Sequence, residues 1–167
     1  FDRDGVHASN GKVNQGILKV LMAHDFIQRM PPKSTGRQEF GRGMVNQIIQ
    51  SFSHISPDDM IRTFCAFTAK SIAENLDKYL NITASDCCII ISGGGVYHPI
   101  LMDDIRNSTK ISNIKTSADI GISPDMKESL LMAILGVARL LEIPANMPPV
   151  TGAGEMVVLG DVIKNNW

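Results

Sequence analysis

The chain has few cysteines, no excess of charge of either sign and no long apolar run. Its three cysteines in 167 residues match neither a disulfide framework nor a metal-ligand spacing. We therefore expect them to be reduced core residues. Sixteen Lys and Arg stand against 17 Asp and Glu, and the resulting net charge of −1 argues against a nucleic-acid-binding or membrane-surface protein.

The hydrophobic pattern also argues against a membrane protein. No apolar run approaches the roughly 20 residues that span a bilayer, and the first residues lack the apolar stretch of a secretory signal. We expect a cytoplasmic protein with neither nucleic-acid nor membrane partners. At 44% hydrophobic residues, the chain is long enough to bury one sizeable core. Its first residue is Phe1, in a charged, motif-like segment, and we expect it to be part of a longer protein.

Two metal-like patterns fail on inspection. Asp2 and Asp4, followed by Gly5, resemble the start of a calcium loop, but Val6 and Val13 stand at positions that need ligands, and His7 stands where that loop needs glycine. The four histidines show no mutual spacing typical of zinc. We predict no metal site within this chain.

Apolar periodicity predicts several helices and few strands. Ser56 and Pro57, followed by two acids, form a helix start, and the same signal recurs at residues 123–125. The predicted helices cover residues 12–24, 38–51, 56–80 and 127–142, with one more starting near residue 99. The last long one is apolar nearly all round and is predicted to be buried on more than one side.

Strands are predicted at residues 87–91 and, less regularly, at residues 111–116. The first is a run of five apolar residues, which is typical of a strand that is covered on both faces. Two or three strands are too few for a stable sheet beside five helices. The sequence therefore predicts a helix-rich α/β protein whose sheet is incomplete without upstream strands.

A glycine turn directly after the first strand is the strongest candidate for a ligand site. Gly93, Gly94 and Gly95 remove every β-carbon from the turn, so a ligand can approach the backbone amides. A helix follows, and His98 stands just before it. This arrangement predicts a site at the carboxyl end of the strand. The alternative is a tight strand-to-helix turn without a ligand, since neither the phosphate-loop nor the dinucleotide pattern is present.

A second candidate is the loop that carries Lys33, Ser34, Thr35 and Arg37. Two cations and two hydroxyls supply many donors for a phosphate, a carboxylate or sugar hydroxyls. The alternative is an exposed helix-entry loop in which Ser34 or Thr35 caps the next helix. Glu128 has the same ambiguity: an acid in the first turn of a helix complements the helix dipole, but it can also accept hydrogen bonds from a sugar.

Five motifs together resemble one family, in order and with similar spacing. They are Phe1-Asp2-Arg3-Asp4-Gly5, Pro31-Pro32-Lys33-Ser34-Thr35-Gly36-Arg37, Ser92-Gly93-Gly94-Gly95, Gly121-Ile122 followed by Glu128, and Pro149-Val150-Thr151-Gly152-Ala153. In these motifs the chain resembles the C-terminal half of anhydro-N-acetylmuramic acid kinases, which belong to the sugar kinase, Hsp70 and actin superfamily. The departures are His98 where that family usually has Asn, Gln38 where it has Glu, and Ser129 where it has Ala.

The resemblance implies an RNase H-like, actin-like ATPase domain over residues 1–167. A helical segment, residues 1–55, is expected on the substrate side, and an α/β segment, residues 56–167, on the nucleotide side. The implied ligands are ATP, Mg²⁺ with ligands mostly outside this chain, and anhydro-N-acetylmuramic acid. The implied partners are an N-terminal domain that this chain does not contain and a possible second copy in a homodimer.

The resemblance also implies an activity and its site. Such a carbohydrate kinase of cell-wall recycling opens the 1,6-anhydro ring with water and phosphorylates O6, giving N-acetylmuramic acid 6-phosphate. Gly93, Gly94, Gly95 and His98 are expected at the nucleotide. The expected sugar-side residues are Lys33, Ser34, Thr35, Arg37 and Glu128. The family's catalytic Asp belongs to an upstream motif, so no catalytic residue is expected here and the chain alone is expected to be inactive. The alternative is a non-catalytic nucleotide- or sugar-binding module of the same fold.

Overall fold

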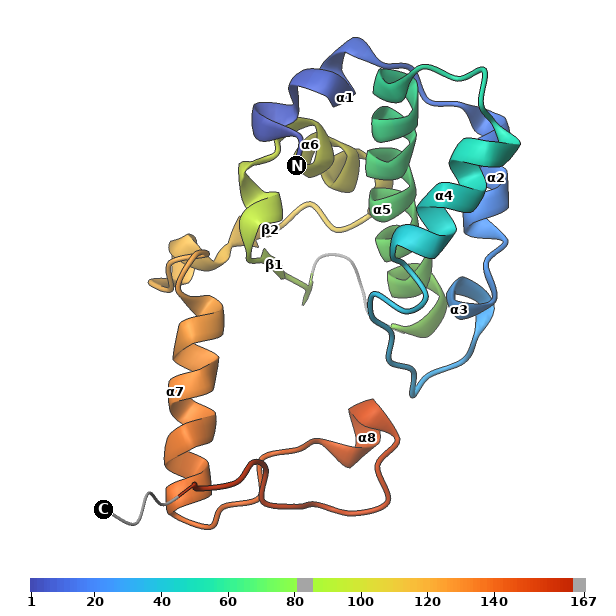
Figure 1. Ribbon diagram of the computed structural model, residues 1–167. Helices are drawn as coiled ribbons and strands as arrows, with labels where there is room; N and C mark the ends of the chain where they lie inside the picture. Colours follow the sequence, from blue (N-terminus) through green and yellow to red (C-terminus); the bar gives the residue numbers. More distant parts are fainter. Residues whose placement is uncertain (81–85, 164–167) are drawn as a thin grey trace. The chain divides into compact units, whose positions relative to one another are not determined.

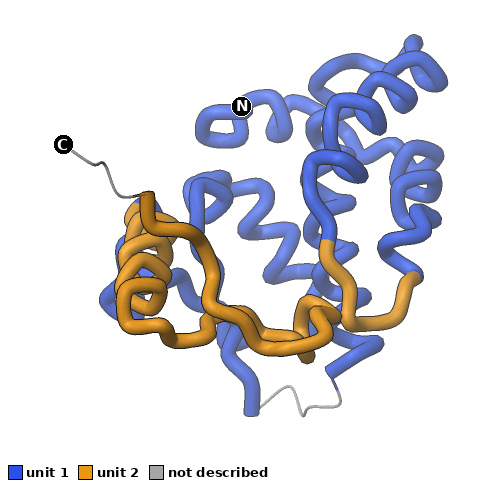
Figure 2. Tube along the Cα trace, turned by 60° about the horizontal axis from the view of Figure 1, so that its bottom comes forward, with its two compact units in different colours: residues 1–28, 35–125 blue, residues 29–34, 126–167 orange. Residues whose placement is uncertain are grey.

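The computed structural model describes residues 1–80 and 86–163 and divides the chain into two compact units (Figure 2). The first unit comprises residues 1–28 and 35–125, and the second comprises residues 29–34 and 126–167. Among the described residues, no helix is long and apolar enough to cross a membrane. The assignment of residues 1–55 to a substrate side and of residues 56–167 to a nucleotide side remains a prediction.

Helices dominate the first unit (Figure 1). They are α1 (Val6–Asn10), α2 (Gln15–Met22), α3 (Asp25–Gln28), α4 (Arg42–Ser51), α5 (Pro57–Tyr79) and α6 (Pro99–Ser108). Helix α5 packs against α1, α2 and α6, and Figure 1 shows it between α2 and α6. It follows its predicted range closely, since Ser56 caps it by accepting a hydrogen bond from the Asp59 amide at 3.1 Å.

Two other helices start later than predicted. Helix α2 begins at Gln15 because the Asn14 side chain accepts the Ile17 amide and caps it there. Helix α4 begins only at Arg42, since the Glu39 and Phe40 amides both bond to the Gly36 carbonyl in a preceding turn. Local capping and turn hydrogen bonds, rather than apolar spacing, set these boundaries.

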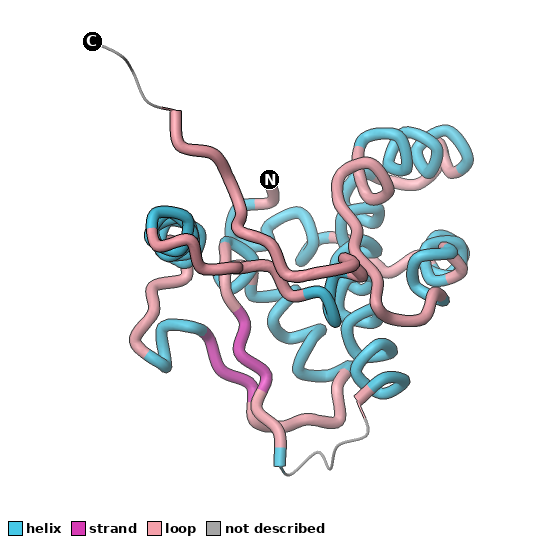
Figure 3. The backbone as a smooth tube through the Cα atoms, turned by 90° about the horizontal axis from the view of Figure 1, so that it is seen from below, coloured by secondary structure: helices cyan, strands magenta, loops and turns pink. Residues whose placement is uncertain are grey.

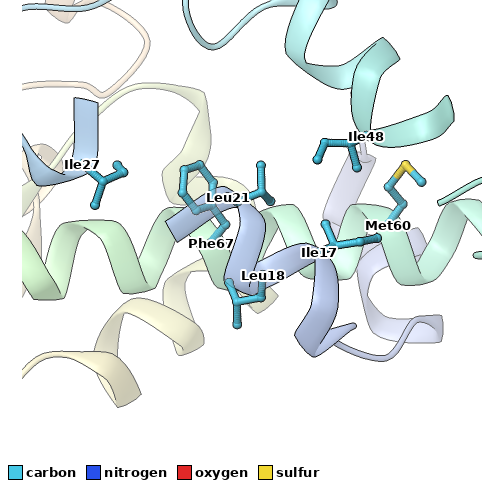
Figure 4. Close-up of a cluster of buried hydrophobic side chains, with 7 residues drawn as sticks. All are labelled: Ile17, Leu18, Leu21, Ile27, Ile48, Met60 and Phe67. Atoms are coloured by element: carbon cyan, nitrogen blue, oxygen red, sulfur yellow. The ribbon is translucent and has the colours of Figure 1, made fainter. Parts of the chain in front are cut away.

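The core of the first unit lies between α2, α4 and α5 (Figure 4). Its buried members are Ile17, Leu18, Leu21, Ile27, Ile48, Met60 and Phe67. Phenylalanines extend it at the edge, where Phe40 meets the Phe26 ring edge-on at a centroid distance of 5.6 Å. This core holds α5 in place and thereby supports α6 on its other side.

One strand of a two-stranded parallel sheet precedes α6 and the other follows it (Figure 3). Strand β1 (Ile89–Ile91) pairs with β2 (Ile114–Thr116), with Ile89 opposite Ile114 and Ile91 opposite Thr116. Both strands are shorter than predicted. The prediction that the first is covered on both faces is wrong for this chain, as the Ile90 side chain is 48% exposed. A sheet of two strands offers too little structure to bury both faces.

The three cysteines are free thiols, but they do not all lie in the core as predicted. Cys88 is exposed, and Cys65 and Cys87 are half-buried. Cys88 immediately precedes β1, whose described sheet has a single partner strand. The apolar sequence around it therefore does not ensure burial here.

The second unit contains α7 (Lys127–Leu140) and α8 (Pro148–Thr151). The prediction that α7 is buried on more than one side is wrong, since none of its residues is buried and Leu140 is 71% exposed. Within this small unit, α7 has little to pack against besides the extended segment around residues 156–162. The side-chain oxygen of Asn146 anchors that segment by accepting a hydrogen bond from the Val157 amide at 2.6 Å.

Candidate functional site

The glycine turn leaves β1 and leads into α6 by way of a 3₁₀ helix, Gly94–Tyr97. Gly93 has a φ of +85°, a left-handed conformation that favours glycine. Gly94 differs, because a β-carbon built on it would meet no atom within 4 Å. Packing within the unit therefore does not require glycine at position 94, and the space beside its backbone is open.

A cavity of about 480 Å³ lies beside this turn. The residues that line it come from the turn, from the start of α6 and from the first four residues of the chain: Phe1, Asp2, Arg3, Asp4, Gly94, Gly95, Tyr97, His98 and Leu101. The structure thus brings together three of the four residues predicted at the nucleotide, and Gly93 adjoins them in the turn. Exposed backbone at two glycines, flanked by Tyr97 and Leu101, suits a flat ring and a polar group bonded to amides.

Asp2, Tyr97 and Leu101 had no individual role in the sequence interpretation. Asp2 lies 96 positions before His98, and only the tertiary structure brings the two side chains together, with Nε2 of His98 3.2 Å from an oxygen of Asp2. The one signal for the first segment was its place among the five ordered motifs. Local spacing could not have assigned it to the same cavity as the glycines.

Asp2 is held as a carboxylate. Burial by itself raises its pKa, but the Ala8 and His7 amides and the His98 ring donate hydrogen bonds to it, and together they hold the pKa of Asp2 below its usual value. Its side chain is 7% exposed. Such a carboxylate supports neighbouring groups rather than reaching into solvent.

Cys65 lies near the same histidine, with its sulfur 3.8 Å from Nε2. Burial raises the pKa of the Cys65 thiol. A protonated thiol is a weak nucleophile, so cysteine, histidine and aspartate here do not form an activated nucleophile of the kind found in thiol enzymes.

Helix α6 is fixed to α5 by an ion pair with two parallel hydrogen bonds. The Arg62 guanidinium donates to both oxygens of Asp104, at 2.5 and 2.8 Å. Both side chains are largely buried, at 21% and 16% exposure. This fork geometry restrains the orientation of α6, and with it the wall of the cavity.

Tyr97 stands at the cavity with its hydroxyl donating to Asp125 at 2.9 Å. That hydrogen bond, and to a lesser degree burial, raises the pKa of Tyr97. In this chain by itself, Tyr79→Phe leaves one tyrosine, and we expect the absorbance titration of its phenolate to have a midpoint above the ordinary value of about 10. Asp125→Asn should lower that midpoint.

The sign of the linked stability follows from the raised pKa. The contribution of the Tyr97–Asp125 bond is complete below the unfolded-state pKa and is lost as the pH rises through the higher folded-state value. A titration midpoint that Asp125→Asn leaves unchanged would contradict a Tyr97–Asp125 bond in solution.

The second predicted loop is divided between the units. Lys33 and Ser34 belong to the second unit, and Thr35 and Arg37 belong to the first. Thr35 donates to the Glu39 carboxylate at 2.5 Å. The alternative that Ser34 or Thr35 caps the next helix is wrong, because Gly41 occupies the N-cap of α4.

Glu128 lies in the first turn of α7 and is exposed. This position suits both interpretations, since an exposed first-turn acid can complement the dipole and still reach a ligand. For metals, residues 1–80 and 86–163 contain no group of three His, Cys, Asp or Glu side chains placed to hold an ion.

Comparison with known proteins gives one consistent family. The family model for anhydro-N-acetylmuramic acid kinase matches residues 1–165. An anhydro-N-acetylmuramic acid kinase of Bacillus cereus (strain 03BB102) is 36% identical over 164 residues, which are 97% of this chain and 43% of the relative. One of Clostridioides difficile (strain 630) is 34% identical over 162 residues, 97% of this chain and 42% of that relative.

The chain spans less than half the length of these curated relatives, but the match extends over nearly all of the chain itself. It includes the first segment, the glycine turn and α7, which were the carriers of the resemblance seen in the sequence. The chain belongs to the anhydro-N-acetylmuramic acid kinase family.

Proposed function

We propose that this chain is the C-terminal part of an ATP-dependent anhydro-N-acetylmuramic acid kinase of peptidoglycan recycling. The whole enzyme adds water across the 1,6-anhydro bond and transfers the γ-phosphoryl group to O6, so that the product is N-acetylmuramic acid 6-phosphate. The observation that carries this proposal is the family match over residues 1–165, together with the cavity at the glycine turn. We place the enzyme in the cytoplasm, where ATP is available, and allow for a homodimer.

We assign the chain to an RNase H-like, actin-like domain. The unit β1–α6–β2, with parallel strands and a connecting helix, is the repeating element of such α/β domains. Two strands are too few for an independent sheet. We infer that strands from the rest of the protein complete it, and the 48% exposure of Ile90 on β1 supports this.

In this proposal, ATP lies against the glycine turn. The backbone amides of Gly93, Gly94 and Gly95 and the ring of His98 contact the adenosine end, and the open space beside Gly94 leaves room for it. Bound Mg²⁺ would neutralise charge on the phosphates during transfer. We expect its ligands mostly outside this chain.

We propose that the side chains of Lys33, Ser34, Thr35, Arg37 and Glu128 contact the sugar. Cationic and hydroxyl donors suit the carboxylate and hydroxyls of a muramic acid derivative. The carboxylate of Glu128 supplies a charged acceptor for the hydroxyl groups of the sugar. The base that activates water is a carboxylate of the upstream motif, so the residues of this chain bind and orient the substrates.

A second candidate is a non-catalytic nucleotide- or sugar-binding module of the same fold. The cavity with the exposed backbone of Gly94 and Gly95 supports it as it supports the enzyme, since binding alone needs no upstream base. The catalytic Asp of the family that this chain resembles lies in an Asp-x-Gly-Pro-Gly-Asn motif, and such a segment encoded before Phe1 would decide for the enzyme.

The activity is tested on the full-length protein with anhydro-N-acetylmuramic acid and ATP. We expect a product heavier than the substrate by one water and one phosphoryl group, formed together with ADP. N-acetylglucosamine serves as the control sugar. ATP-dependent product from N-acetylglucosamine alone, with the anhydrosugar untouched, would refute this assignment.

Glu128→Gln separates the two roles of that acid. If Glu128 accepts hydrogen bonds from the sugar, the full-length variant should lose roughly ten- to hundredfold in kcat/KM for the anhydrosugar while its ATP affinity is kept, because the substrate donors are left without a charged partner. If it serves only the helix dipole, the change should cost about 0.3–1 kcal/mol of stability and leave the kinetics alone.

We expect the kinetic loss. Glu142→Gln is a matched control, since Glu142 follows α7 in the same unit and has no place in the proposed site. Wild-type kcat/KM in Glu128→Gln would remove Glu128 from the substrate site.

A further inference from the structure

Asp2 connects two parts of the first unit that are far apart in sequence. Its two carboxylate oxygens accept hydrogen bonds from the His7 and Ala8 amides at the start of α1, each at 2.9 Å. One of the same oxygens lies 3.2 Å from Nε2 of His98. The carboxylate therefore joins the first segment of the chain to the start of α6.

The other ring nitrogen of His98 also has a defined partner. Nδ1 accepts a hydrogen bond from the Leu101 amide at 3.2 Å, which makes His98 the N-cap of α6. Because Nδ1 accepts, the ring proton of the neutral form is on Nε2, where it can be donated to Asp2. Both edges of the ring are thus held, one by the helix and the other by the carboxylate.

Close packing restrains the ring as well. A β-carbon on Gly5 would lie 3.1 Å from Cε1 of His98 and 3.2 Å from the Ile100 side chain. Gly5 is buried and has a φ of +69°. The backbone at Gly5 therefore lies close to the ring and leaves little room for a side chain.

The position of this ring matters for the cavity, because His98 directly follows the Gly94–Tyr97 helix and lines the cavity with Gly94 and Gly95. We propose that Asp2 is a positioning residue for the nucleotide-binding turn and that it acts through His98. This inference rests on the proposed function. Asp2 itself is not proposed to contact the nucleotide, because three donors already engage its oxygens and its side chain is only 7% exposed.

The test uses Asp2→Asn, His98→Asn and the double variant in the full-length protein. Asparagine at position 98 can still cap α6, but its amide is too short to serve both Leu101 and Asp2. For each variant, the affinity for a non-hydrolysable ATP analogue is measured by calorimetry. Asp103→Asn is the matched control, as Asp103 is an exposed acid of α6 that pairs with Arg106.

We expect Asp2→Asn to weaken analogue binding roughly ten- to hundredfold, as for the loss of a hydrogen bond to a charged group. The double variant should be no weaker than the weaker single variant, since both changes break one connection. Wild-type affinity in Asp2→Asn, or losses that multiply in the double variant, would overturn the inference. If Asp2→Asn does not fold, Asp2→Glu takes its place, because it keeps the charge but displaces it from the ring, and wild-type affinity in Asp2→Glu would then overturn the inference.

A second readout needs no nucleotide. In the wild type, nitrogen chemical shifts of the His98 ring should show the proton on Nε2, with slow exchange of that proton with water. Asp2→Asn should accelerate this exchange, and Asp103→Asn should not. An unchanged exchange rate in Asp2→Asn would overturn the Asp2–His98 connection. A wild type that shows the slow exchange of the ring proton but binds no ATP analogue would instead contradict the proposed nucleotide site and its positioning by Asp2.

Discussion

The chain purified by itself is expected to transfer no phosphoryl group from ATP to anhydro-N-acetylmuramic acid. Phosphoryl transfer depends almost wholly on positioning and electrostatic stabilisation. In the proposed enzyme, the carboxylate that activates water and the loop that holds the phosphates both belong to the rest of the protein. The chain spans 42–43% of its relatives, and in this proposal its part is to bind and orient the substrates.

The measurement is ADP release that depends on the anhydrosugar, compared between the chain and the full-length protein under the same conditions. Addition of a separately expressed N-terminal part serves as the control, since recovery of turnover would show that the chain was competent but incomplete. Sugar-dependent turnover by the chain alone would contradict this division of roles.

Gly94→Val is expected to abolish nucleotide binding in the full-length enzyme while the fold is retained. A β-carbon on Gly94 would meet no atom within 4 Å, and the φ of Gly94 lies outside the left-handed region. The fold therefore does not require glycine at this position. A bound nucleotide does require glycine there, because a valine side chain would occupy the space through which the ligand approaches the backbone amides. We expect affinity for ATP to fall by more than about a hundredfold, measured by calorimetry.

Gly43→Val is the matched control, since a β-carbon on Gly43 also meets nothing within 4 Å but lies on α4, away from the turn. It should leave ATP affinity unchanged. Both variants should keep the wild-type circular dichroism spectrum. An unchanged ATP affinity in Gly94→Val would remove the glycine turn from the site.

Sequence patterns located those elements that depend on local chemistry. The Ser56 cap with Pro57 predicted the start of α5, and the structure has it at Pro57. The run into three glycines predicted the succession of strand, turn and helix, and β1, the 3₁₀ helix and α6 follow in that order. In each case, the determining residues lie within a few positions of one another.

The failures have a common physical cause. Burial of β1 and α7 was predicted from apolar content, but Ile90 and Leu140 are largely exposed in the described structure. A high apolar content indicates that a helix or strand packs against a partner surface, but it does not indicate whether that surface lies in the same chain. Exposed apolar faces on these elements are therefore what the proposed larger protein would cover.

The candidate site was predicted only in part, for a related reason. Gly94, Gly95 and His98 line one cavity, and they are close in sequence. Asp2 shares that cavity across 96 positions, and no periodicity or spacing connects residues that meet only in the tertiary fold. The resemblance marked the segment around Asp2 as part of the family pattern without giving its partner.

The most direct test of a nucleotide site at the glycine turn is a crystal structure of the full-length protein with a non-hydrolysable ATP analogue. We predict adenosine density in the cavity lined by Gly94, Gly95 and His98, with at least one backbone amide of the turn within hydrogen-bond distance of the ligand. A nucleotide bound elsewhere, with the amides of Gly93, Gly94 and Gly95 facing only solvent, would contradict the account.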